Sequence, residues 1–326
     1  MRKSESVVLK VATTNVPWLW RVVNRTPWLR SALNRYAINR LASAARARPH
    51  PRSLWGDHIS WTGMVDRTWT GRHLPPADRS YVDSLPTDKD RLKRLFARNG
   101  EMLPCPKSSA LFGFFAQWFT DSFLRTDPAD NLKNTSNHEI DLCQIYGLKA
   151  EDTRIIRGDG ERGELEWQDI GGEEYPPFLF ESEGIRVKQK YLDLSYIDKE
   201  TADFKRVNDV IPGDFNTRER KAKFFVTGLE RGNSTVLYSA LNTVFLREHN
   251  RLCRLLDKAH PTWSSDRLFE TARNINIAQI LKIIIEDYIN HLSPAHFKVF
   301  VEVGFAETKR WYRTNRICAE FNLLYR

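Results

Sequence analysis

The chain has 326 residues and 41% of them are hydrophobic, so it is long and apolar enough to bury a sizeable core and is not a disordered segment. Its formal charge is +9, but the basic residues are dispersed apart from a cluster between Arg21 and Arg52. Because no recognised nucleic-acid-binding motif accompanies that charge, we expect no nucleic-acid partner.

The cysteines and the N-terminus bear on the cellular location. The four cysteines are widely spaced and form no CxxC pair, which disfavours a zinc site and fits a reducing compartment. The first residues are basic but lack the apolar core of a secretion signal. No apolar stretch reaches the roughly 18–20 residues that span a bilayer. We therefore expect a cytoplasmic protein or one that is peripheral on a membrane.

Residues 17–47 form the first predicted helical unit. Apolar residues recur at helical spacing from Trp28 to Leu41 with arginines between them, and Pro27 separates them from an apolar segment at Trp18–Val23. Two interpretations stay open. The unit is a helical hairpin packed on the body of the protein, or its apolar face lies in one leaflet of a membrane with the arginines at headgroup level.

A second predicted helix carries an unusual pair of polar residues. After an irregular, proline-punctuated stretch and a short basic helix over 88–99, residues 110–124 are apolar nearly all round, which is typical of a core helix. Gln117 and Asp121 interrupt this run four residues apart and so share one face. They either serve a capping or ion-pair role or face a polar cavity or cofactor.

The remaining chain predicts a mainly α fold. Residues 125–215 hold loops and a few short strands, including one at 174–180. Helices are expected within 228–259, over about 267–291 and over about 309–325, with the sequence HPTW at 260–263 ending the first of them.

Several long blocks resemble the cyclooxygenases (prostaglandin-endoperoxide synthases) of the animal haem peroxidase superfamily, in the same order and over nearly the whole chain. The blocks are WRVVNRTPWLRSALNRYAINR (20–40), HISWTGMVDRTWTGRHLPP (58–76), FFAQWFTDSF (114–123), HEIDLCQIYG (138–147), TVFLREHNRLCRLL (243–256), residues 260–292 and RTNRICAEFNLLY (313–325). The resemblance implies a haem-peroxidase-like helical domain over 53–326, its N-terminal part only, after a membrane-binding-like helical region over 1–52.

The resemblance also implies a cofactor, haem b, and residues on its oxygen-binding side. Gln117 matches the family's glutamine on that side, whereas Asp121 stands where the family has a histidine. A carboxylate can act as a base, but its charge repels a peroxide anion and its usual pKa makes it a poor acid at neutral pH. Gln117 and Asp121 are thus the candidate catalytic and cofactor-binding residues.

Two tyrosines match the family's oxygenase machinery. Tyr325 matches the tyrosine whose radical removes a hydrogen atom from an unsaturated fatty acid before O2 adds, and Tyr288 matches its hydrogen-bonding partner in the substrate channel. The implied activity is that of a haem peroxidase and fatty-acid dioxygenase, an oxidoreductase. The alternative interpretation is that both tyrosines are only aromatic residues of the core.

The substrate anchor and the iron ligand are less well matched. The family's carboxylate-binding arginine aligns with Leu41 and its tyrosine partner with Ala295, so Arg40, or Arg46 or Arg48, is the candidate anchor. The proximal histidine would follow Tyr325 beyond Arg326, and no iron ligand is assigned within the chain. We therefore expect these residues by themselves to hold haem weakly and to be inactive, whether as a truncated reading frame, a fragment or a pseudogene product.

The last expectations concern two histidines and the binding partners of the protein. We expect His249 and His138 to be structural rather than haem ligands. The implied partners are an unsaturated fatty acid and O2, with a membrane surface as a further candidate, and a homodimer is compatible with the sequence. The alternative function is a membrane-surface protein without catalysis.

Overall fold

The computed structural model describes residues 13–45, 68, 70–71, 77–158, 161–205, 216–309, 311–312 and 317–325. Helices dominate these residues and strands are few and short, which confirms the predicted mainly α class. The chain forms two compact units. The first comprises Met1–Arg46, Phe114–Phe123 and Glu139–Thr314, and the second comprises Ala47–Gly113, Leu124–His138 and Asn315–Arg326.

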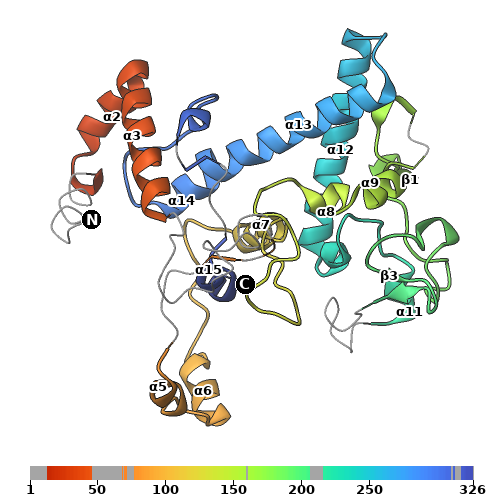
Figure 1. Ribbon diagram of the computed structural model, residues 1–326, viewed down its shortest axis with the longest axis horizontal. Coiled ribbons are helices and arrows are strands. Elements are labelled where there is room, and N and C mark those ends of the chain that lie inside the picture. The colour runs from red at the N-terminus through yellow and green to blue at the C-terminus, as the bar shows by residue number, and fades with distance from the viewer. Residues whose placement is uncertain are drawn as a thin grey trace, which may run out of the picture. The chain divides into compact units, whose positions relative to one another are not determined.

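The N-terminal helices of the first unit are α2 (Pro17–Arg25) and α3 (Pro27–Ala45), labelled in Figure 1. Both begin at a proline, which suits a first helical turn because the missing N–H has no partner there. The predicted break at Pro27 is therefore confirmed. The expected functional boundary at residue 52 lies outside the described residues and stays a prediction.

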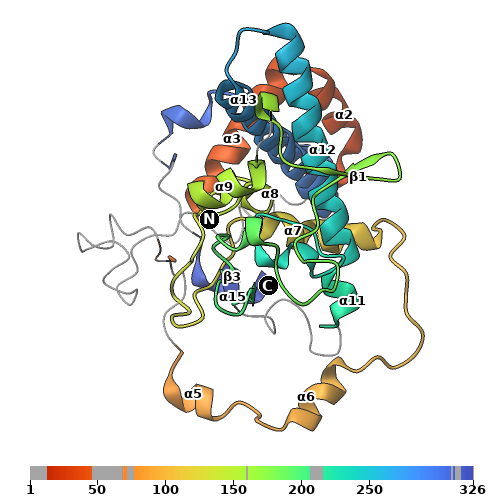
Figure 2. The same cartoon turned by 90° about the vertical axis from the view of Figure 1, so that its right-hand side faces the viewer.

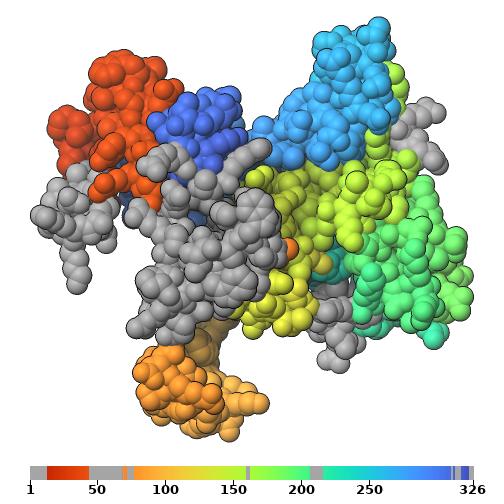
Figure 3. Space-filling view, viewed as in Figure 1, coloured from red at the N-terminus to blue at the C-terminus, as the bar shows by residue number. Residues whose placement is uncertain are grey.

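One side of this helix pair packs on the segment 296–311. Asn34 Nδ2 donates to the Phe300 carbonyl at 2.9 Å, and Trp311 Nε1 donates to Asn39 Oδ1 at 2.8 Å. The other side stays open, since Trp28 is 73% exposed. The helices therefore pack on the body of the unit and still present apolar side chains at its surface, where they appear red in Figure 3.

The core of the first unit is a helical hairpin. Its arms are α12 (Val236–Ala259) and α13 (Ser265–Lys282), which lie side by side in Figures 1 and 2. Thr235 caps α12 by accepting from Tyr238 N, and Ser264 caps α13 by accepting from Arg267 N. The predicted turn at 260–263 joins them, with His260 stacked on Trp263 at a centroid distance of 4.1 Å.

Short elements surround the hairpin. They are α8 (Cys143–Tyr146), α9 (Ala150–Arg157), η2 (Glu161–Gly163), η3 (Gln189–Tyr191), α11 (Arg218–Lys221) and η5 (Glu230–Asn233). Strands β1 (Gln168–Ile170) and β2 (Glu173–Tyr175) pair antiparallel, as do β3 (Ile197–Asp198) and β4 (Asp203–Phe204). The predicted extended piece at 174–180 is confirmed, because β2 is followed by bridges from Phe178 to Phe225 and from Phe180 to Val187.

Two asparagines, of which Asn250 is buried, hold these irregular segments in place. The Asn250 side chain bonds both backbone groups of Leu165, at 2.8 and 3.1 Å, and Asn233 does the same for Phe225, at 2.9 and 2.8 Å. A primary amide can replace one pair of β-sheet backbone hydrogen bonds because it offers both a donor and an acceptor. Loops around α12 are thus fixed without extended sheets.

The C-terminal part departs from the expected continuous helices. Residues 283–289 form a π-helical segment, η6 (Ile283–Ile289), between α13 and α14 (Asn290–Leu292). The predicted helix over 309–325 is wrong at 309, 311–312 and 317–318, which are not helical. A short turn, η7 (Ala306–Thr308), precedes this range, and among its described residues the helical part is α15 (Ala319–Tyr325). The Trp311 side chain is held by Asn39, so a tertiary contact replaces helical continuation there.

The second unit carries α5 (Arg79–Asp83), α6 (Lys89–Phe96), the start of α7 (Ala110–Thr120) and α15. Asp78 and Asp88 cap α5 and α6, and α6 confirms the short basic helix expected over 88–99. Gly71 bonds along the backbone to Ile317 and Ala319, which ties the segment before α15 into this unit. Among the described residues, no helix combines the length and the apolar character needed to cross a bilayer.

Candidate functional site

Of the predicted pair, Gln117 lies in helix α7 and Asp121 directly follows the helix. The two side chains have different surroundings. Asp121 lies just past the helix end and is 4% exposed, whereas Gln117 is exposed. The expectation that 110–124 is buried nearly all round is wrong, since Leu111 is 47% exposed. Burial is confined to the C-terminal end of α7 and the residues after it, where the helix meets the body of the first unit. Gln117 therefore presents its amide at a surface while Asp121 is enclosed.

The buried end of α7 is anchored on α12. Trp118 Nε1 donates to Asn242 Oδ1 at 2.8 Å, and the Trp118 ring stacks on Phe245 at 4.8 Å with an interplanar angle of 25°. Trp118 is fully buried, so this bond also satisfies an indole N–H that would otherwise be costly to bury. The contact fixes the position of Asp121, three residues further along the chain.

Tyr288 lies against the same helix. Its ring centroid is 5.1 Å from that of Phe119 in an edge-to-face arrangement and 6.0 Å from that of Phe115. Tyr288 is 9% exposed and belongs to the π-helical segment η6, a type of distortion that recurs at functional sites. The structure therefore brings Tyr288 together with α7, as the predicted site requires.

The structure describes the surroundings of Tyr325 and Arg40 in less detail. Tyr325 closes α15 in the second unit, so its proximity to Tyr288 stays a prediction. Arg40 is exposed on α3, next to the 64% exposed Leu41. The alternative anchors Arg46 and Arg48 lie outside the described residues.

His249 sits in a buried hydrogen-bonded cluster with Tyr146 and Asn276. Its Nδ1 lies 3.0 Å from the Tyr146 hydroxyl and its Nε2 lies 3.1 Å from the Gly163 carbonyl. Asn276 Nδ2 donates to the same hydroxyl at 3.0 Å. Burial lowers the pKa of His249 to about 4, so the ring is neutral at neutral pH. The predicted structural role is confirmed, because both ring nitrogens are engaged.

His138 also has a structural contact. Its Nδ1 accepts a hydrogen bond from the Ile317 backbone N–H at 3.0 Å, inside the second unit. Among the described residues, no group of three or more His, Cys, Asp or Glu side chains could hold a metal ion. All four cysteines are free thiols.

Sequence reasoning missed Tyr238, a residue beside Asp121. Tyr238 is 1% exposed, and its hydroxyl has no hydrogen-bond partner within the part of the chain that the structure describes. Burial raises the pKa of Tyr238 well above its ordinary value, and the charge of Asp121 is the next largest cause. The signal was present in YSALN, where Tyr238 and Asn242 stand four apart on one helical face.

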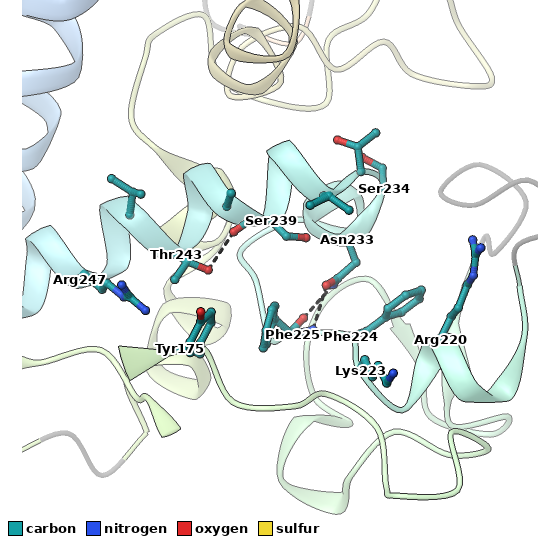
Figure 4. Close-up of a pocket in the computed structure, with 14 residues that line it drawn as sticks. Tyr175, Arg220, Lys223, Phe224, Phe225, Asn233, Ser234, Ser239, Thr243 and Arg247 are labelled. Carbon is teal, nitrogen blue, oxygen red and sulfur yellow. Dashed lines mark hydrogen bonds between the residues drawn. The ribbon is translucent and has the colours of Figure 1, made fainter. Parts of the chain in front are cut away.

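A pocket of about 690 Å³ opens on the opposite face of α12, towards Ser239, Thr243 and Arg247 (Figure 4). Tyr175 and Phe225 line its other side, with their rings stacked at 5.8 Å. Its lining includes none of the predicted site residues. The cavity is therefore separate from the place where α7 meets α12.

The residues around α7 fit one side of a haem pocket. The exposed Gln117 amide can donate a hydrogen bond and the buried Asp121 carboxylate can accept one, which are the donor and acceptor types that an oxygen ligand on haem iron would need. None of these residues is a ligand for the iron itself.

Comparisons with known proteins identify relatives along most of the chain. A model of the family described as animal haem peroxidase matches residues 90–305. The chain is 31% identical to prostaglandin G/H synthase 2 of Equus caballus over 327 residues, covering 96% of this chain and 48% of that protein. It is 31% identical to prostaglandin G/H synthase 1 of Rattus norvegicus over 319 residues, covering 94% and 48%. The chain thus spans about half the length of the curated relatives it matches.

Two solved structures are similar at lower identity. Peroxidase A of Dictyostelium discoideum matches with a TM-score of 0.45 and 16% identity over 61% of this chain and 43% of that one. The fatty acid alpha-dioxygenase of Oryza sativa matches with a TM-score of 0.43 and 15% identity over 70% and 36%. The family match and the relatives that cover nearly all of this sequence confirm the predicted resemblance. The chain belongs to the animal haem peroxidase family.

Proposed function

We propose that this chain carries the oxygen-side helix and the tyrosines of a haem-dependent fatty-acid oxygenase. The observation that carries the proposal is the packing of Tyr288 against Phe115 and Phe119 of α7, within one unit. That contact places a residue of the proposed substrate channel beside the helix that bears Gln117 and ends before Asp121. Family membership and the relatives' names support the same chemistry.

The proposed roles follow from the side chains. Haem b, when bound, would supply the oxidising equivalent that converts Tyr325 to a phenoxyl radical. The Tyr325 oxygen then takes a hydrogen atom from a bisallylic carbon, O2 adds to the carbon radical, and the peroxyl radical takes the hydrogen atom back. Asp121 accepts a proton at a carboxylate oxygen, and Gln117 donates a hydrogen bond from its amide. Arg40 pairs with the fatty-acid carboxylate.

Haem titration and oxygen uptake test this function together. The full-length protein that contains these residues and the part that would supply the iron ligand is mixed with haem b, the Soret band is recorded, and O2 consumption is measured with a fatty acid that contains a bisallylic methylene. We expect Tyr325→Phe to keep the Soret band and lose O2 uptake, while Tyr312→Phe keeps both. A full-length protein that develops no Soret band, or a Tyr325→Phe variant that consumes O2 normally, would contradict the proposal.

A second candidate function is attachment to a membrane surface. On α2 and α3 several large apolar side chains are exposed; they are Trp18 at 64%, Leu19 at 40%, Val22 at 54%, Trp28 at 73%, Tyr36 at 64% and Leu41 at 64%. Residues 17–45 contain five arginines and no acidic residue. Aromatic side chains beside cations suit the interface of an anionic bilayer. This role is compatible with the first and also stands without catalysis.

A further inference from the structure

Tyr238 and Asp121 lie on the surface where α7 meets α12. Trp118 contacts Asn242 and Phe245, which share a helical face with Tyr238, one turn earlier in α12. Asp121 follows Trp118 by three residues, and its backbone N–H still bonds the Gln117 carbonyl at 3.1 Å. Because α7 packs on α12 in this way, the Asp121 carboxylate lies towards the end of α12 that contains Tyr238.

The two side chains are enclosed together. Tyr238 is 1% exposed and Asp121 is 4% exposed, and both belong to the first unit. Burying a hydroxyl that forms no hydrogen bond destabilises a fold. Buried polar groups in native proteins are therefore nearly always bonded to a neighbour or to a water. The Tyr238 hydroxyl needs an acceptor, and the carboxylate of Asp121 is the strongest acceptor near it.

The charged and titratable groups that face Tyr238 come from three elements. Besides Asp121 after α7, they are Cys143 of α8 and Glu230 of η5. Burial is the main cause that raises the pKa of Tyr238 well above its ordinary value, and the charge of Asp121 adds to it. Tyr238 therefore keeps its proton throughout the neutral range and remains a hydrogen-bond donor.

We propose that Tyr238 is a positioning residue whose hydroxyl donates to the Asp121 carboxylate, directly or through one buried water, and so holds that carboxylate ionised and oriented at the end of α7. A hydrogen bond to the charged form of a carboxyl group lowers its pKa and opposes the effect of burial. In the site proposed above, Asp121 then serves as a proton acceptor and not as a proton donor. That consequence rests on the proposed function, whereas the pair itself does not.

The direct test is the titration of Asp121 in the haem-free chain. Aspartate residues are labelled with ¹³C at the carboxyl carbon, and the Asp121 resonance is identified by its loss in Asp121→Asn. In Tyr238→Phe we expect the midpoint of the Asp121 titration to rise by about one pH unit or more, a tenfold change in its acid dissociation constant. An unchanged midpoint overturns the proposal.

Tyr196→Phe is the matched control. Tyr196 is 7% exposed and donates to the Thr227 carbonyl at 2.7 Å, so the variant also removes a buried phenol hydroxyl. It should leave the Asp121 midpoint where it is in the unchanged chain. A midpoint that moves equally in both variants indicates general loosening of the unit and also overturns the proposal.

A second measurement covers the case in which Tyr238→Phe does not fold. In Asp121→Asn, the infrared C–O band of ¹³C-labelled tyrosine should lose the component of one strongly donating hydroxyl, and an unaltered spectrum overturns the pair. None of these readouts uses haem or substrate. A failure of the proposed function, seen as no Soret band or no O2 uptake, is therefore distinct from a failure of this inference.

Discussion

Two buried polar clusters lie on the same face of α12, and they differ in how their hydrogen bonds are used. At His249, both ring nitrogens are engaged by Tyr146 and by the Gly163 carbonyl. At Tyr238, about three turns earlier, the hydroxyl has no bonding partner among the described residues. A saturated cluster stabilises a fold, whereas an unsaturated one is ready to bind a proton, a water or a ligand. The difference separates a structural histidine from a candidate site on one helix.

The largest expected effect comes from a change that disrupts both clusters. Helix α8 contributes Tyr146 to the His249 cluster and Cys143 to the Tyr238 cluster, and Gly228 packs directly on this helix. A Cβ atom on Gly228 would lie 1.9 Å from the Cys143 carbonyl oxygen and 2.5 Å from the Gly147 nitrogen. We expect Gly228→Ala to cost about 3 kcal/mol or more of unfolding free energy, measured by chemical denaturation.

Gly113→Ala is the control for that substitution. No heavy atom lies within 4 Å of the Cβ position at Gly113, which is an exposed helical residue of α7. The variant should be neutral or slightly more stable, by up to about 1 kcal/mol. Equal losses in the two variants would contradict the packing of α8 against Gly228.

The His249 cluster should make stability depend on pH. The pKa of His249 is about 4 in the folded chain and 6.5 in the unfolded chain, so between these values the unfolded state binds more protons. Stability should therefore fall as the pH drops from 6.5 towards 4, by on the order of 3 kcal/mol in total. His249→Gln should remove this part of the pH dependence, measured by denaturation at several pH values. His260→Gln, at an exposed position, should leave the dependence intact, and a His249→Gln profile parallel to that of the unchanged chain would count against the cluster.

The hydrogen bond that anchors α7 on α12 is expected to contribute somewhat less to the free energy of unfolding than the His249 cluster. Asn242→Leu removes the acceptor of the buried Trp118 N–H and should cost about 1–3 kcal/mol. It should also shift the Trp118 fluorescence, because the indole environment changes. Thr243→Val, on the next residue, removes only a bond to the Ser239 carbonyl and should cost about 1 kcal/mol or less. If the Thr243 variant is the less stable of the two, the proposed anchor is wrong.

The smallest expected effect is on membrane binding, from substitutions of exposed side chains on α2 and α3. Replacing Trp18 and Trp28 by Ser should weaken co-sedimentation with vesicles of phosphatidylcholine and phosphatidylserine by about tenfold, since both rings leave water when the helices bind. Phe96→Ser removes an aromatic side chain on α6 that is even more exposed, at 86%. It should leave binding unchanged. Identical binding by all three proteins would remove the membrane-surface proposal.

The sequence predicted local features well and tertiary surroundings poorly. Helical spacing and Pro27 predicted α2 and α3, and the turn at 260–263 was expected, because both depend on backbone preferences within a few residues. The spacing of Tyr238 and Asn242 indicates that they share a face of α12, but which segment covers that face depends on tertiary packing. The exposure of Gln117 depends on tertiary packing in the same way. Likewise Trp311 bonds Asn39 instead of continuing a helix. Proximity of Tyr288 to Tyr325 remains a prediction, since the two tyrosines belong to different units.

The central claim is that Asp121 faces the oxygen side of a bound haem, and cyanide affinity tests it most directly. Cyanide is an anionic iron ligand, so a nearby carboxylate should weaken its binding. In the haem-loaded full-length protein that contains these residues, we expect Asp121→Asn to bind cyanide about tenfold more tightly, an effect of about 1.4 kcal/mol. Asp152→Asn removes another fully buried carboxylate, one that is bonded to Ser195 at 2.7 and 2.8 Å, and should leave cyanide affinity unchanged. Equal cyanide affinity in the unchanged chain and in Asp121→Asn would contradict the account.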